Sequence, residues 1–151
     1  MGGKATKQIE NLVLFIIVFL VLLGGWVYFV GGITSVAPPV KQYLSNANIS
    51  SSLEEFRRYE NTHARTNFRI SDTTENENEY AIYAIVNIIR DKHNLEFHLK
   101  FEENKSDEKT IIAVTSVFDK SAHTGGYNIK YPEVKELVTV FEKLVWKEIA
   151  L

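Results

Sequence analysis

One long apolar run, residues 12–30, constrains this chain more than any other feature of its sequence. Its nineteen residues, LVLFIIVFLVLLGGWVYFV, carry no charge and are interrupted only by a pair of glycines. At about 1.5 Å per residue, a helix of this length spans roughly 28 Å, close to the hydrocarbon thickness of a bilayer. A helix also closes its backbone hydrogen bonds internally, as the lipid interior requires. The run therefore predicts a single transmembrane helix.

A cleaved signal peptide is the alternative for this run, because Ser35, Val36 and Ala37 form a small-residue pattern after it. Two features argue against cleavage. The apolar core is longer than the roughly 7–15 residues of a signal peptide. Cleavage after Ala37 would also place Pro38 at the new N-terminus, where its ring hinders attack on the bond. A helix buried inside a soluble domain is a poorer alternative, because so small a domain would have to cover it on all sides.

The charges around the run predict its orientation. Lys4 and Lys7 precede it against a single Glu10, and the other side has no charge before Lys41. The positive-inside rule then places the N-terminus in the cytoplasm, or its matrix or stromal equivalent, and the globular domain on the opposite side of the membrane. We expect an N-terminal arm and anchor at 1–33, a linker at 34–50 and one globular domain at 51–151.

Glycines recur at the C-terminal end of the run. Gly24 and Gly31 lie seven residues apart, as do Gly25 and Gly32, so each pair returns to nearly the same face of a helix. Small residues let a second helix approach closely in lipid, which predicts packing against another membrane-embedded helix. Alternatively, the first pair softens the helix and the second ends it.

The rest of the chain predicts an α+β domain. Leu95, Phe97, Leu99 and Phe101 alternate with polar residues, which is typical of a strand with one buried face. A capping-box sequence at 51–54 opens one helix, and apolar residues recurring every three or four positions after Pro132 predict another. We expect helices at 52–64 and 132–149, strands at 68–70, 80–89, 95–102 and 111–118, and a loop at 71–79. The predicted fold is the transmembrane helix followed by a two-layer domain, a four-stranded antiparallel sheet flanked by helices.

Composition excludes several kinds of chemistry. The chain has no cysteine, so disulfides, thiolate metal sites and cysteine nucleophiles are ruled out. Its 17 Lys and Arg against 19 Asp and Glu are not the basic footprint of a nucleic-acid-binding protein. His63, His93, His98 and His123 share no metal-ligand spacing. We expect no catalytic residue, no metal, no cofactor and no nucleic-acid partner.

The connection at 119–131, DKSAHTGGYNIKY, is too long for a plain turn and is the candidate binding loop. Its two glycines allow positive φ or close backbone approach, and its polar side chains offer donors to an acidic or carbonyl partner. A structured but inert crossover is the competing interpretation. The candidate residues are Lys120, His123, Gly125, Gly126, Tyr127 and Lys130.

The strand IIAVTSVF, the Gly-Tyr-Asn crossover and the charged helix within 111–136 resemble an uncharacterised bacterial and plastid domain family. Ser116, Gly126 and Asn128 match that family's pattern, and Asn-Leu-Glu-Phe at 94–97 resembles its Asp-Val-Glu-Phe. The family's arginines and loop aspartate are missing, because Asp119-Lys120 and Thr124 stand in their places. The resemblance implies an α+β architecture and carries no assigned activity.

Taken together, these features predict a single-pass, membrane-anchored, non-catalytic accessory or scaffolding subunit of a multi-subunit membrane complex. Its expected partners are other membrane subunits and the lipid bilayer. The alternative is a membrane-tethered binding module that captures a lipid, peptide or small ligand with the 119–131 loop.

Overall fold

A computed structural model of the chain describes residues 19, 38–77, 79–104 and 109–149. The chain divides into two compact units, Met1–Val36 and Ala37–Leu151. The second unit is α+β, and its described elements are β1 (Lys41–Ser45), α2 (Ile49–Thr62), β2 (Thr66–Asn76), β3 (Glu79–Arg90), β4 (His93–Asn104), β5 (Lys109–Asp119), β6 (Thr124–Gly126), α3 (Pro132–Phe141), the π-helical segment η1 (Glu142–Trp146) and α4 (Lys147–Ile149).

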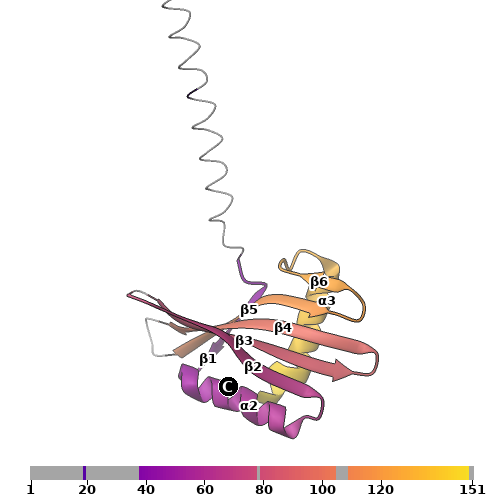
Figure 1. The fold of residues 1–151 in the computed structure, drawn as a ribbon, viewed down its shortest axis with the longest axis horizontal. Helices are drawn as coiled ribbons and strands as arrows, with labels where there is room; N and C mark the ends of the chain where they lie inside the picture. Colours follow the sequence, from indigo (N-terminus) through magenta and orange to yellow (C-terminus); the bar gives the residue numbers. More distant parts are fainter. Residues whose placement is uncertain (1–18, 20–37, 78, 105–108, 150–151) are drawn as a thin grey trace, which may run out of the picture. The chain divides into compact units, whose positions relative to one another are not determined.

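The six described strands form one antiparallel sheet (Figure 1). Its order is β1-β5-β4-β3-β2, and β6 also pairs with β5. The four long strands β2, β3, β4 and β5 pair in sequence order as an antiparallel meander. β1 pairs with residues 110–114 of β5 and β6 pairs with 117–119, so the two short strands share one edge of β5.

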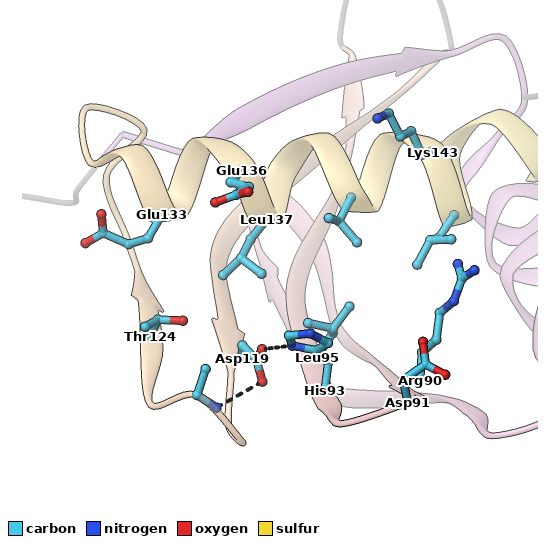
Figure 2. A pocket seen from close by; sticks show the side chains of 13 residues that line it. Arg90, Asp91, His93, Leu95, Asp119, Thr124, Glu133, Glu136, Leu137 and Lys143 are labelled. Atoms are coloured by element: carbon cyan, nitrogen blue, oxygen red, sulfur yellow. Dashed lines mark hydrogen bonds and ion pairs between the residues drawn. The ribbon is translucent and has the colours of Figure 1, made fainter.

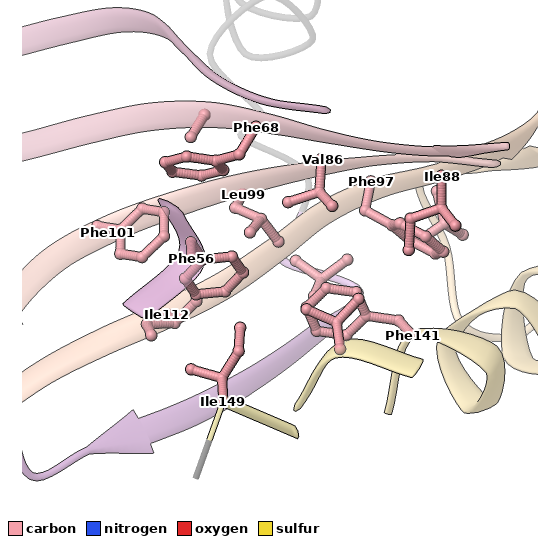
Figure 3. Close-up of a cluster of buried hydrophobic side chains, with 14 of the residues drawn as sticks. Phe56, Phe68, Val86, Ile88, Phe97, Leu99, Phe101, Ile112, Phe141 and Ile149 are labelled. Atoms are coloured by element: carbon pink, nitrogen blue, oxygen red, sulfur yellow. The ribbon is translucent and has the colours of Figure 1, made fainter. Parts of the chain in front are cut away.

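The helices pack on one face of the sheet, and aromatic side chains join the two layers (Figures 1 and 3). Phe56 of α2 meets Phe101 of β4 edge-on, with ring centroids 5.4 Å apart. Phe141 of α3 lies 5.1 Å from Phe97 of β4. All four rings are fully buried. The alternating apolar pattern of β4 therefore faces the helices, as its sequence predicts.

The C-terminal helical stretch begins at Pro132, and all the apolar side chains of its predicted stripe are buried. Its regularity changes at Glu142–Trp146, where the turns widen to a π-helix. The Tyr59 hydroxyl of α2 donates a 2.6 Å hydrogen bond to the carbonyl oxygen of Leu144 inside this segment. Such widened turns are rare.

The predicted four-stranded sheet is wrong, because two short strands join it. β1 lies in the stretch expected as linker, and β6 lies in the candidate binding loop at 119–131. β1 has only five residues and β6 only three, two of them glycine. Neither segment has the length or β-branched content that marks a strand in a sequence; the edge of β5 supplies the hydrogen bonds that hold both.

Two boundaries also differ from expectation. β2 continues through most of the predicted 71–79 loop to Asn76, with a bulge at Ser71. Its polar residues are tolerated because β2 is an edge strand. α2 begins at Ile49, and its cap is Asn48, whose side-chain oxygen accepts a 2.9 Å hydrogen bond from the Ser51 amide.

The predicted transmembrane helix is not seen. Within the described ranges, no helix combines the length and the hydropathy needed to cross a membrane. Apart from Phe19, the apolar run 12–30 lies outside the described residues, and so do Gly24, Gly25, Gly31 and Gly32.

Candidate functional site

A pocket of about 530 Å³ lies between α3 and the neighbouring ends of β3, β4 and β5 (Figure 2). We call it the helix pocket. Its volume lies in the range typical of small-molecule sites. Apolar side chains also line it, namely Leu95 of β4 and Leu137, Val140 and Leu144 of the C-terminal helical stretch; Leu95 and Leu137 lie near its middle (Figure 2). Ala122 and Thr124 bring the 119–131 segment into the wall.

Charged side chains of opposite sign stand at the two ends of the helix pocket. Glu133 and Glu136 lie at one end, and Arg90 and Lys143 lie at the other (Figure 2). All four are exposed, and none of them forms an ion pair with another described residue. Asp91 lies beside Arg90 and reduces the positive charge of that end. The pocket thus combines an apolar middle with ends able to attract groups of opposite charge.

A buried carboxylate forms the wall between these ends. Asp119 is 3% exposed, and its Oδ2 accepts a hydrogen bond from Nδ1 of His93 (Figure 2). Its Oδ1 accepts from the backbone amides of Ser121 at 3.0 Å, Ala122 at 3.3 Å and Asn94 at 3.3 Å. Asp119 therefore ties the β3–β4 turn to the turn that leaves β5.

These contacts also set the ionisation of Asp119. Burial alone raises its pKa, but the hydrogen bonds from His93 and the three amides outweigh burial and hold the pKa below its usual value. The His93 side chain is 59% exposed, so its second ring nitrogen can reach solvent or a bound molecule.

The structure separates the candidate residues of the 119–131 loop into three places. Lys120, His123 and Gly125 surround a second hollow of about 650 Å³. Gly125, Gly126 and Tyr127 line a third hollow of about 470 Å³. Lys130 lines none of these three hollows. The six residues therefore do not converge on a single site.

Lys120 has an internal partner on the sheet face opposite the helices. It pairs with Glu96, which is 7% exposed and also lies 2.8 Å from Nε2 of His98. Burial raises the pKa of Glu96, but the hydrogen bonds from Lys120 and His98 outweigh this and leave the pKa below its usual value. His98 meets Phe118 edge-on at 6.0 Å, and Phe118 meets Tyr127 at 5.4 Å. These contacts tie the loop to β4.

The histidines are dispersed in the structure as in the sequence. His63 stacks on Tyr59, His93 pairs with Asp119 and His98 pairs with Glu96. His123 is exposed, at a positive φ of 54°. No group of three or more His, Asp or Glu side chains within the described ranges could hold a metal ion.

No protein-family model, curated protein or solved structure gives a significant match to this chain. The resemblance to the bacterial and plastid domain family therefore gains no support from these comparisons.

Sequence reasoning missed the helix pocket and the His93–Asp119 pair. In the sequence, His93 stands out only as one of four histidines without metal-ligand spacing, and Asp119 only as the first residue of the candidate binding loop. The pair could have been found from the predicted antiparallel pairing of these two strands. Antiparallel neighbours place the start of β4 beside the end of β5, and Leu95 and Asp119 are register partners there.

Replacing Asp119 by Asn should lower the free energy of unfolding at pH 7 by about 1.5–3 kcal/mol, the usual worth of hydrogen bonds to a charged group. The pKa of Asp119 is lower in the folded chain than in the unfolded chain, where it is about 3.9. The carboxylate therefore stabilises the fold fully at pH values above about 3.9, and this stabilisation is lost as the pH falls through the folded-state pKa. Denaturant unfolding of the full chain between about pH 7 and 2 should show a shallower acid decline for D119N. D91N, in the adjacent turn, is the control, and an equal acid decline in wild type and D119N would contradict this role.

Gly125 and Gly126 should respond differently to substitution by Ala. Gly125 has φ +129°, and a Cβ there would lie 2.2 Å from the Val117 carbonyl oxygen, so G125A must separate β6 from β5. Gly126 has φ +154°, but its nearest neighbour would be the Val134 side chain at 3.5 Å. We expect G125A to cost at least about 2 kcal/mol of stability and G126A about 1 kcal/mol, measured by denaturant unfolding. Equal losses of stability in the two variants would show that the positive φ, and not the contact with β5, sets the cost of the substitution.

Proposed function

We propose that this protein is a membrane-tethered binding module whose helix pocket takes a small amphipathic ligand. The observation that carries the proposal is the arrangement of the pocket. Its apolar side chains lie between charges of opposite sign that form no ion pair with another described residue. An acyl or other apolar segment suits Leu95, Leu137 and Val140. A ligand carrying both a cationic and an anionic group would complement Glu133 and Glu136 at one end and the basic pair at the other.

Attachment to a membrane is part of this proposal and rests on the sequence. The uncharged run 12–30 matches the thickness of a bilayer, and two lysines precede it. We place the folded unit on the side of the membrane opposite to these lysines. A single-chain zwitterionic lipid is a ligand that a pocket held beside a bilayer would encounter.

We assign binding rather than catalysis to the pocket. Asp119 uses both carboxylate oxygens in four hydrogen bonds, three of them to backbone amides. That is the pattern of a carboxylate that holds two turns together. His93 then serves as a polar contact for the ligand.

The test is photocrosslinking of the full chain, in a non-ionic detergent, with a photoreactive lysophosphatidylcholine. Crosslinks should map by mass spectrometry to the peptide containing residues 137–144. The double variant R90E/K143E should reduce labelling several-fold because it removes the anion-attracting end. R57E/K147E makes the same charge change at exposed positions outside the pocket and should label like wild type. Equal labelling of both double variants would contradict the proposal.

A second candidate function is the accessory subunit of a membrane complex, and the open face of the sheet favours it. The helices pack on one face only, and the register places Tyr83, Ile111 and Leu44 on the other. Leu44 is exposed, and Tyr83 and Ile111 are partly exposed. Apolar side chains among ion pairs are typical of a transient protein interface.

The accessory-subunit candidate predicts an assembly larger than one chain after extraction from native membranes in mild detergent. The Y83E variant should shift the assembly towards the monomer, measured by light scattering on the eluted particle, because a charge then stands in the buried interface. R57E on α2 is the matched surface control. A wild-type protein that elutes as a monomer would contradict this candidate.

A further inference from the structure

Residues 127–131, which we call the aromatic loop, contain three large hydrophobic side chains that are exposed to solvent. Tyr127 is 61% exposed, Ile129 38% and Tyr131 57%. In the described part of the chain, the other exposed large hydrophobic residues are distributed singly along the sequence. Single exposed apolar residues are ordinary on a protein surface, but a concentration of them marks a contact site.

The aromatic loop is held in one shape by its own hydrogen bonds. Asn128 accepts from the Lys130 amide through its side chain at 3.0 Å and from the Tyr131 amide through its carbonyl at 3.2 Å. The Tyr127 ring packs edge-on against Phe118, and the Tyr131 carbonyl accepts the Lys135 amide at the start of α3. A surface that is fixed before binding loses little entropy when it binds.

The position of the loop along the fold indicates what it contacts. Pro38 lines the same hollow as Tyr127, Asn128 and Tyr131. The apolar run ends at Val30, eight residues before Pro38 in the sequence. The aromatic loop therefore lies at the end of the domain from which the chain leads back to the apolar run.

The chemistry of the loop fits a lipid headgroup layer. Tyrosine is enriched at membrane interfaces because its ring is apolar and its hydroxyl is wet. Ile129 supplies a wholly apolar side chain between the two tyrosines. Lys130, also in the loop, can attract lipid phosphate.

We propose that the aromatic loop rests in the headgroup layer of the membrane that holds the apolar run. This inference rests on the membrane attachment in the proposed function. Pro132 and Glu133 follow the loop directly, so docking would bring the acidic end of the helix pocket close to the bilayer surface. The cationic group of a zwitterionic lipid would meet Glu133 there.

The natural absence of cysteine makes a direct test possible. Ile129→Cys in the full chain, labelled with a nitroxide and reconstituted in phosphatidylcholine vesicles, reports the depth of the loop by electron paramagnetic resonance. We expect its collision rate with a water-soluble nickel chelate, relative to oxygen, to be several-fold lower than for Ile70→Cys. Ile70 is the matched control, because it is 41% exposed on β2, at the far edge of the sheet from β6.

Adding Y127S and Y131S to the Ile129→Cys chain should return the label to the accessibility of the control. Chains that float with the vesicles but have a label at 129 as accessible as the one at 70 would overturn the loop proposal and leave membrane attachment standing. Chains that do not float with the vesicles would overturn both. Because the vesicles contain no other kind of protein, protection at 129 cannot come from a different protein partner. Protection that fades as the chain is diluted in the vesicles would show contact between copies of the chain and overturn the loop proposal.

Discussion

The burial of one face of β4 against the helices determines the arrangement of this domain. Phe97 and Phe101 each meet a phenylalanine from a different helix, so the central strand fixes both α2 and α3. Aromatic pairs of this kind add about 0.5–1.5 kcal/mol each beyond the area that they bury. With Phe141 fixed over the middle of the sheet, the first turns of α3 extend past it towards the ends of β4 and β5. The helix pocket lies in the space left there.

At the end of the sheet beside the helix pocket, hydrogen bonds and ion pairs of buried carboxylates hold the turns. Asp119 collects four donors from two turns that are distant in sequence. On the opposite face of the sheet, Glu96 of β4 pairs with both Lys120 and His98. The Lys120 pair holds the turn that follows β5 against β4. Two buried carboxylates with depressed pKa values thus flank one turn, so the shape of the pocket wall depends on their staying ionised.

The spacing of apolar residues in the sequence predicted those elements whose buried face shows in their own sequence. The alternation along β4 and the apolar stripe after Pro132 are strong signals, and both elements formed as expected. β1 and β6 escaped prediction because the neighbouring edge of β5 holds them, while their own sequences give little sign of a strand. The His93–Asp119 pair was missed for a related reason: its members are 26 residues apart and meet only through the register of β4 and β5.

The shared edge of β5 affects how copies of this protein can associate. β1 and β6 together occupy residues 110–114 and 117–119 of that edge, so little of it is left to template an incoming strand. In the described sheet, the long edge that stays open belongs to β2, which is interrupted by a bulge and carries Arg69, Asp72 and Glu75. Bulges and charges on an edge strand are the usual protection against intermolecular sheet growth. The β2 edge is therefore a poor template for strand pairing between neighbouring copies of the chain.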